Sequence, residues 1–353
     1  MNKKFLTALA ALIIGITSVL STACNSNTPS PTSTTQSEVS NQVSPTPAYA
    51  DRTLVKVATL KGPTGIGMVK LFDDNDNKLT VNRYETTIVG TPDEIVGKIS
   101  SGEIDIAAVP TNLAATLYNK TEGKVQLLAI NTLGVLYILE KGDTVKTIAD
   151  LKGKKLYASG KGSTPEFILN YILTQNGIDP VKDLTIEYKT EHSELATLAA
   201  AGNADLVMLP EPFVTSLLMG NSEFEKKIDL STEWEKATKA AGVDNSVLAM
   251  GGLIVRTDFA MKNKEAVDAF MTEYKASVDY VNSNLTEAAD LVVKYGIMAA
   301  AGPAKLAIPS CNIVFIAGAD MKTQIANIYD VFFTSNPKSI GGKLPGDDFY
   351  YMK

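Results

Sequence analysis

The sequence predicts an α/β protein with two lobes, each a mixed, mostly parallel sheet flanked by helices. Residues 54–117 align without gaps with residues 154–217, one hundred positions later. Both copies contain an apolar strand, a Lys-Gly-x-Thr turn and an apolar helix, followed later by a helix ended by Gly and a strand ended by Pro. Because each copy alternates strands with helices, the repeat indicates two α/β units and therefore two lobes.

The first half of the body contains five runs that are typical of strands. They cover residues 54–60, 84–89, 105–109, 125–131 and 136–140. A Gly/Pro turn follows the first run, and we expect a helix at about residues 66–72. Thr91 and Glu94 have the spacing of a capping box, so a helix should begin there and end at Gly102.

The second copy repeats this plan, and a helical region follows it. Strands are expected at residues 156–159, 184–189, 205–209 and 247–255, with helices at 193–201, 265–282, 286–295, 303–308 and 319–335 and a last strand at 312–317. Ser163 and Glu166 have capping-box spacing, and Gly177 ends the helix that they open. The helical tail indicates that the chain returns to the first lobe. Crossings near residues 138–140 and 250–255 would then form a two-strand hinge.

The amino-terminal segment has the pattern of a bacterial export signal. Lys3 and Lys4 precede an apolar run over residues 5–20, which is too short and too quickly followed by polar residues for a transmembrane helix. The run leads into Ser21-Thr22-Ala23-Cys24, which resembles a lipobox, although Leu stands one position earlier than usual. We therefore expect a signal peptide over residues 1–23 and lipidation of Cys24, with palmitate among the acyl chains. The alternative is ordinary cleavage near Ala23, which would leave Cys24 as a free thiol.

Composition indicates an exported protein and excludes some classes of partner. Residues 24–52 are rich in Ser, Thr, Pro, Asn and Gln and are predicted to be a disordered tether. With Cys24 lipidated, Cys311 has no partner, so no disulfide is expected. The net charge of −6 argues against binding to nucleic acid. The sequence contains no metal-ligand cluster, nucleophile–base set or phosphate-binding loop, so we expect no cofactor and no enzyme activity.

Candidate ligand-binding residues lie where strands end, because open α/β sheets bind ligands at the carboxyl ends of their strands. The turns after the first strand of each copy offer backbone N–H groups and hydroxyls, and their residues are Gly62, Pro63, Thr64, Gly65, Gly162, Ser163 and Thr164. Thr111 and Asn112 follow another strand end, and one of them is needed to cap a helix. The alternative for all of these residues is that they serve only as turns and caps.

Two further candidates carry ionisable side chains. Glu211 stands between two prolines at a strand end, where it would accept hydrogen bonds from an N–H group of a ligand. Its alternative role is that of an acid in the first turn of a helix, which the helix dipole favours. His192 is the only histidine and also follows a strand. The alternative is that it is an ordinary surface or core residue, as a lone histidine more often is.

Several short motifs together resemble a known family. They are the lipobox with its tether, Lys61-Gly62-Pro63-Thr64-Gly65, Leu209-Pro210-Glu211-Pro212-Phe213 and Gly252-Leu253-Ile254-Val255-Arg256. In combination they resemble a substrate-binding protein of an ABC importer, of the nitrate/sulfonate/taurine and thiamine-precursor type. The resemblance implies the type II periplasmic-binding fold over about residues 53–351, and a membrane permease as partner.

We therefore expect an extracytoplasmic, lipid-anchored monomer that captures a small molecule between its lobes. Lobe 1 would comprise residues 53–138 and 252–353, and lobe 2 residues 139–251. Because Glu211 lies at a strand end and no Arg fork is evident on the strand-end turns, a neutral or weakly cationic heterocycle is favoured over a sulfonate or nitrate. An exported enzyme or a sensory lipoprotein that uses the same cleft remains the alternative.

Overall fold

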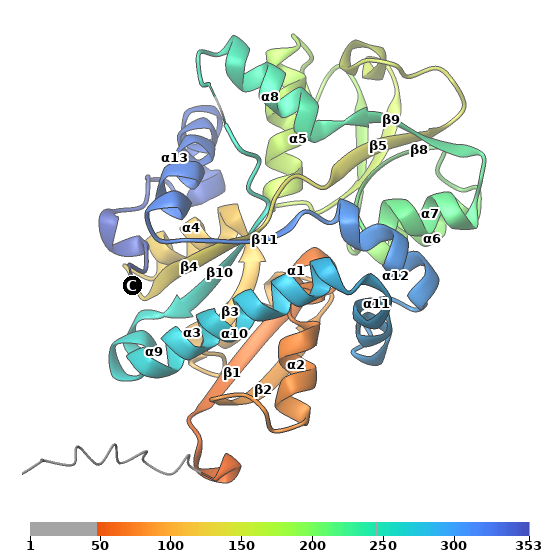
Figure 1. Cartoon of the computed structure of the whole chain (residues 1–353). Coiled ribbons are helices and arrows are strands. Elements are labelled where there is room, and N and C mark those ends of the chain that lie inside the picture. Colours follow the sequence, from red (N-terminus) through yellow and green to blue (C-terminus); the bar gives the residue numbers. More distant parts are fainter. Residues whose placement is uncertain (1–47, 245, 353) are drawn as a thin grey trace, which may run out of the picture. The chain divides into compact units, whose positions relative to one another are not determined.

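The computed structural model describes residues 48–244 and 246–352. The predicted signal peptide and Cys24 lie outside these residues. Within them, none of the helices combines the length and the apolar character that crossing a bilayer requires. The described body contains two separate sheets, and most of their strands are labelled in Figure 1.

The first sheet has six strands in the order β11-β4-β10-β3-β1-β2. In chain order they are β1 (Leu54–Leu60), β2 (Arg83–Val89), β3 (Ile106–Pro110), β4 (Val125–Thr132), β10 (Gly251–Arg256) and β11 (Ile313–Ala317). Strand β1 pairs in parallel with β2 and β3, whereas β10 runs antiparallel to β3 and β4. The sheet is therefore mixed, and it combines segments from both ends of the body.

The second sheet has five strands in the order β7-β6-β8-β5-β9. They are β5 (Leu136–Lys141), β6 (Lys155–Ser159), β7 (Thr185–Lys189), β8 (Leu206–Pro210) and β9 (Phe224–Asp229). Strand β6 is parallel to β7 and β8, and β5 is antiparallel to β8 and β9. This sheet is also mixed, so the predicted α/β class with a mixed sheet in each lobe is confirmed.

Thirteen α-helices are assigned in the described residues. They are α1 (Pro63–Ile66), α2 (Val69–Asp76), α3 (Asp93–Ser101), α4 (Thr111–Lys120), α5 (Thr164–Gln175), α6 (His192–Ala200), α7 (Phe213–Gly220), α8 (Leu230–Ala240), α9 (Thr257–Lys262), α10 (Lys264–Ser283), α11 (Leu285–Lys294), α12 (Ala301–Ala307) and α13 (Gly318–Ser335). Apolar residues on the inner faces of these helices are buried, as amphipathic patterns predict.

The hundred-residue repeat is reproduced in three dimensions. Strands β3, β1 and β2 stand side by side in one sheet, and β8, β6 and β7 stand in the equivalent order in the other. The later strand and helix of each copy also correspond, since β3 and β8 both end at a proline that leads into a helix. The repeat predicted from the sequence is therefore a structural repeat.

Three local predictions were wrong. The expected single helix at 66–72 is two short helices, α1 and α2, because the chain turns at Gly67. The expected strand at 247–255 begins only at Gly251. The Ser163 capping box does not form, since the Ser163 hydroxyl donates to Gly160 O and Glu166 accepts from Gly162 N instead.

The crossings between the sheets differ slightly from the predicted positions. Strand β5 starts at Leu136 and lies wholly in the second sheet, so the first crossing is the short segment 133–135. The return crossing is the segment that precedes Gly251. The predicted lobe boundaries at residues 138 and 251 stay predictions.

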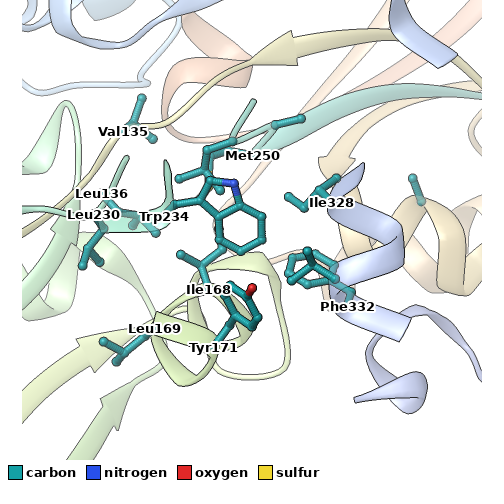
Figure 2. Close-up of a cluster of buried hydrophobic side chains, with 14 of the residues drawn as sticks. Val135, Leu136, Ile168, Leu169, Tyr171, Leu230, Trp234, Met250, Ile328 and Phe332 are labelled. Carbon is teal, nitrogen blue, oxygen red and sulfur yellow. The ribbon is translucent and has the colours of Figure 1, made fainter. Parts of the chain in front are cut away.

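An apolar cluster fills the space beside these crossings. The Trp234 ring of α8 lies 5.2 Å from the ring of Tyr171 in α5 and 6.2 Å from that of Phe332 in α13. Figure 2 shows these rings together with Val135 and Met250, which belong to the two crossing segments. Trp234 is fully buried, and its indole N–H donates to Ser246 Oγ at 3.1 Å. The cluster thus joins helices that follow strands of different sheets.

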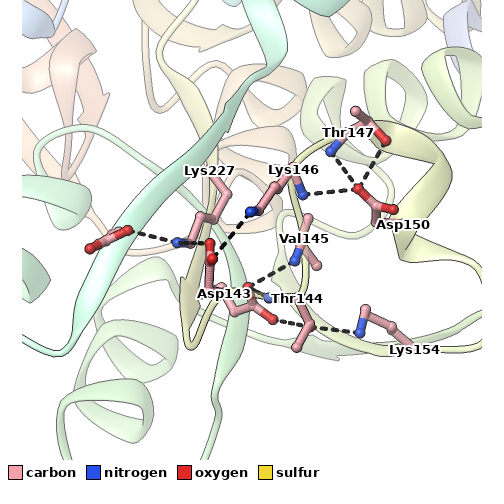
Figure 3. A network of polar contacts seen from close by, with 10 residues as sticks. Asp143, Thr144, Val145, Lys146, Thr147, Asp150, Lys154 and Lys227 are labelled. Atoms are coloured by element: carbon pink, nitrogen blue, oxygen red, sulfur yellow. Dashed lines mark hydrogen bonds and ion pairs between the residues drawn. The ribbon is translucent and has the colours of Figure 1, made fainter.

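The loop after β5 is held by polar contacts (Figure 3). Asp150 accepts hydrogen bonds from the backbone N–H groups of Lys146 and Thr147, and Lys227 pairs with Asp143 at 3.3 Å. Burial alone would raise the pKa of the Glu140 carboxyl, but hydrogen bonds from Thr144 and Val145 lower it. These contacts fix the end of β5 that lies away from the strand ends considered below.

We predict that Trp234→Ala lowers the free energy of unfolding by about 3–5 kcal/mol, because it leaves a cavity among fully buried side chains. Urea denaturation followed by circular dichroism measures this, since the variant lacks the only tryptophan of the chain. Lys236→Ala on the same helix is the control, because that side chain is 65% exposed, and it should change stability by less than about 0.5 kcal/mol. A loss below about 1 kcal/mol for Trp234→Ala would contradict the role given to the cluster.

Candidate functional site

A cavity of about 100 Å³ lies where strand ends of both sheets come together. From the first sheet it is lined by the ends of β1, β3 and β4 at Leu60, Pro110 and Thr132. From the second sheet it is lined by Pro210 at the end of β8 and by Gly160 directly after β6. This is the position at which open α/β sheets bind ligands.

The lining combines apolar surface with a few polar groups. Five prolines contribute, and they are Pro63, Pro92, Pro110, Pro165 and Pro210. The polar side chains are Thr64, Thr132, Ser163, Thr190 and His192. Lys61 is the one lining side chain that is charged at neutral pH. Such a lining suits a small organic molecule with few hydrogen-bonding groups.

Four of the predicted ligand residues line this cavity. Pro63 and Thr64 come from the turn after β1, and Ser163 and His192 come from the segments after β6 and β7. The Thr64 hydroxyl is held only by long contacts of 3.4 Å, to Thr59 Oγ1 and Leu60 O, so it is available to a ligand. A binding role for these four residues stays a prediction that their position supports.

Thr111, Asn112 and Thr164 instead join the two copies to each other. Thr164 Oγ1 lies 3.2 Å from Thr111 Oγ1 and donates to Asn112 Oδ1 at 3.0 Å. Asn112 Nδ2 also donates to Gly162 O at 3.4 Å. These side chains are buried and none of them lines the cavity. Their hydrogen bonds hold the amino end of α4 against that of α5.

Gly62 and Gly65 shape the first turn and do not line the cavity. Gly62 has φ of 136°, a conformation that glycine adopts readily. A Cβ atom on Gly65 would lie 2.5 Å from Leu60 O, so only glycine fits there without a shift of the backbone. The structure thus gives both glycines a role in the turn.

Glu211 lies away from the cavity lining and is fully buried. Its carboxylate accepts hydrogen bonds from Lys226 Nζ at 2.9 Å and from Thr215 N at 3.0 Å. Lys226 belongs to β9, a strand that was not recognised in the sequence. Because Glu211 already has a cationic partner, it gives no reason to expect a cationic ligand.

His192 begins α6, and its imidazole ring is one of the two ionisable side chains that line the cavity. The Ser159 hydroxyl and His192 Nδ1 share a hydrogen bond of 2.6 Å, and the Phe213 ring centre lies 5.6 Å away. Burial lowers the pKa of His192 to about 4, so the ring is neutral at physiological pH. Ser159 is buried and does not line the cavity, so this pair does not present a nucleophile to a ligand.

Thr132 lines the candidate cavity and was not recognised in the sequence. Its side chain is 2% exposed and lines the cavity, and its hydroxyl has no hydrogen-bond partner among the described residues. Buried hydroxyls usually have a partner, so this one is suited to a ligand. The available signal was its place at the end of a strand, where Asn131 and Thr132 precede Gly134.

A second hollow of about 620 Å³ lies between α5 and α13. Tyr171, Thr174, Asp330 and Asn336 are among the residues that line it. It is larger than the first cavity, but it lies between helices, whereas the smaller cavity gathers strand ends of both sheets. The smaller cavity is therefore the candidate site.

Comparisons with known proteins agree with this geometry. Residues 70–240 match a family described as the periplasmic substrate-binding protein of a phosphonate ABC transporter. YtlA of Bacillus subtilis, provisionally named a binding protein, is 34% identical over 77 residues, 22% of this chain. That match spans 21% of the length of YtlA.

Solved structures share the fold over most of the chain. An ABC transporter protein from Parabacteroides distasonis has a TM-score of 0.68 at 23% identity, covering 85% of this chain and 99% of that one. The aliphatic sulphonate-binding protein SsuA of Escherichia coli has a TM-score of 0.64 at 16% identity, with 82% and 96% covered. The alkanesulfonate-binding protein SsuA of Xanthomonas axonopodis, bound to MOPS, has a TM-score of 0.62 at 14% identity, with 80% and 93% covered. The predicted fold and the resemblance to substrate-binding proteins of ABC importers are thus confirmed.

We predict that His192 makes folding stability depend on pH between about 6.5 and 4. In this window the unfolded chain binds a proton that the folded chain does not, so the free energy of unfolding falls as the pH is lowered. The full loss, reached near pH 4, is about 3 kcal/mol. Urea denaturation of the wild type and of His192→Asn at several pH values isolates this contribution.

The same pKa is measured directly by NMR, because the untagged chain gives a single imidazole signal. A midpoint near pH 6.5, or identical pH profiles for the two proteins, would contradict the burial of a neutral ring.

Proposed function

We propose that this chain is the extracytoplasmic solute-binding component of an ABC importer, which captures a small molecule between two lobes and delivers it to a membrane permease. One observation carries the proposal: the cavity is bounded by strand ends of two sheets that repeat one plan. The family match over residues 70–240 supports the same function. Binding occurs without chemical change, and the partner is the permease of the importer.

Capture would proceed by movement of one lobe against the other. The segment 133–135 and the segment before Gly251 connect the sheets, so rotation at these segments changes the width of the cavity. The hydrogen bonds of Thr164 with Thr111 and Asn112 lie at the edge of this space and act as a pivot. A solute that contacts both lobes favours the narrow state by the contacts that it makes only there.

The solute is a small, neutral polar molecule. The cationic preference expected from Glu211 is dropped, because Lys226 already neutralises that carboxylate. Arg256 is likewise occupied, since it pairs with Asp105 at 3.2 Å. Two of the structural relatives are named as sulfonate-binding proteins, and Lys61 is a cation at the cavity. A small anion is therefore the competing class of solute.

The chain would work as a monomer tethered to the outer face of the cell membrane. Residues 1–23 are removed as a signal peptide, Cys24 carries the lipid, and residues 24–52 connect it to the body. Stable anchoring needs two or more acyl chains, which a mature bacterial lipoprotein has. With a root-mean-square reach of about 25–30 Å, the tether keeps the body close to the permease.

We predict that Cys24→Ser moves the protein from the membrane fraction to the soluble fraction, because the lipid cannot be attached. Immunoblotting of the two fractions, with metabolic labelling by palmitate, measures this. Cys311→Ser is the matched control, because that thiol is buried in the body, and it should keep both the label and the membrane location. Retention of the Cys24→Ser protein in the membrane would refute the anchor.

We also predict that the solute copurifies with the protein, or that the two lobes close when the solute is added. Native mass spectrometry should show an added small-molecule mass, and removal of the solute by reversible unfolding should increase the radius of gyration in small-angle scattering. Adding the solute back should raise the melting temperature as its concentration rises. An equal radius of gyration with and without bound solute would exclude closure. If incubation with a cell extract released the bound molecule in a chemically changed form, the protein would instead be an enzyme.

A further inference from the structure

Four buried polar atoms beside the cavity have no hydrogen-bond partner among the described residues. They are Nδ2 and Oδ1 of Asn131, Oγ1 of Thr132 and Oη of Tyr274. Asn131 and Tyr274 are fully buried, and Thr132 is 2% exposed. Buried polar groups are rarely left unpaired, because losing water without gaining a partner destabilises the fold, so a cluster of them points to a binding partner.

Gly251 brings this cluster next to the cavity. A Cβ atom built on Gly251 would lie 2.5 Å from Asn131 Oδ1, 3.0 Å from Thr64 Cγ2 and 3.4 Å from Thr132 Cβ. Gly251, Thr64 and Thr132 all line the cavity. The Asn131 amide therefore lies directly behind a residue that has no side chain to block it.

Tyr274 of helix α10 lies next to the Asn131 amide. Its hydroxyl lies 2.8 Å from where a Cβ atom on Gly67 would be, in the turn after α1. Burial raises the pKa of Tyr274, and a polar contact with the Asn131 side chain lowers it in part, so the phenol and the amide lie within reach of each other although they form no hydrogen bond of normal geometry. The phenol is therefore un-ionised at physiological pH and is able to donate or accept a hydrogen bond.

We propose that Asn131, Thr132 and Tyr274 form a polar recess behind Gly251 that receives the head group of the transported solute. This proposal rests on the solute-binding function proposed above and deepens it. The solute head enters past Gly251, and the rest of the molecule lies among the prolines and His192. Asn131 and Thr132 are thus the residues that determine specificity, and Tyr274 positions the Asn131 amide.

The chemistry of the recess fixes the class of head group. A side-chain amide presents both a donor and an acceptor, so its best partner also carries both. Asn131, Thr132 and Tyr274 are uncharged and almost fully buried, so a full charge placed against them would find no opposite charge among them. The head is therefore an uncharged donor–acceptor edge, such as an amide or an amino-substituted nitrogen heterocycle. An anionic group on the same molecule would have to lie at the other end, near Lys61.

The test uses calorimetry with four small probes on the mature chain. Acetamide and 4-aminopyrimidine are neutral and carry a donor beside an acceptor, whereas methanesulfonate and methylphosphonate are anions. We expect saturable heats with 4-aminopyrimidine and weaker ones with acetamide. Thr132→Val and Tyr274→Phe remove single hydroxyls without changing shape, and each should weaken 4-aminopyrimidine binding at least tenfold.

Stability of the solute-free variants separates a binding role from a structural one. Because the Thr132 hydroxyl has no partner among the described residues, Thr132→Val should leave the melting temperature unchanged or raise it. Tyr274→Phe loses only the contact with Asn131, so it should lower the melting temperature less than the controls do. Thr238→Val and Tyr84→Phe are matched controls, since each removes a hydroxyl that is bonded to Trp234 O or to Glu273. The controls should lower the melting temperature and keep probe binding.

Three results would overturn the proposal. They are binding of either anion without a response to the neutral probes, wild-type affinity in both variants, and a fall in melting temperature like that of the controls with binding intact. Failure of all four probes would also count against the proposed head group. Solute capture itself is judged separately, by the mass of the molecule that copurifies with the protein.

Discussion

The hydrogen bonds of Thr164 are the interaction on which the rest of the site depends. Its hydroxyl joins Thr111 and Asn112, so the amino end of a helix that follows β6 is held against the amino end of a helix that follows β3. Strand ends of two different sheets are thereby brought to the edge of one small space. The apolar cluster around Trp234 supports this contact, because it packs α5 and α8 against α13. The cavity is a consequence of both contacts.

The charged groups in and around that space are few or already paired, which supports the proposed solute of low charge. The ring of His192 is kept neutral by burial, Glu211 is paired with Lys226, and Arg256 is paired with Asp105. The lining consequently contributes apolar surface of a fixed shape, several hydroxyl groups and one lysine. Binding energy must then come from burial of apolar surface against the prolines and from a few well-placed hydrogen bonds. Such a site discriminates between solutes mainly through unpaired polar groups. When a solute of the wrong shape binds, its head group or the polar groups of the site are left without hydrogen-bond partners.

Much of the fold could be predicted because the repeat and the strand-end punctuation are local signals. Strand β1 has the predicted bounds, and β3 and β8 end at the prolines that indicated their ends. The cavity lies at the strand ends that the same signals indicated, and Pro63, Thr64, Ser163 and His192 line it, while their binding role stays a prediction. Thr111, Asn112 and Thr164, which join the two copies of the repeat, are residue types that also occur in ligand-binding turns. Their partners lie about fifty residues away, so the sequence could not separate the two roles.

The ion pair of Glu211 could not be foreseen for a related reason, because its partner Lys226 stands on a strand that lacks a clear apolar pattern. Thr132 and Asn131 were not recognised in the sequence, because what distinguishes them is that their polar side-chain atoms are buried without hydrogen-bond partners. Only the packed structure reveals this.

The most direct test of the account is a crystal structure of the protein with the solute that copurifies with it. We expect electron density for one molecule that contacts Thr64 and Thr132 from one sheet and Ser163 or His192 from the other. Density confined to one lobe, or located in the hollow beside Tyr171 and Asp330, would contradict the claim that the strand ends of both sheets form the solute site.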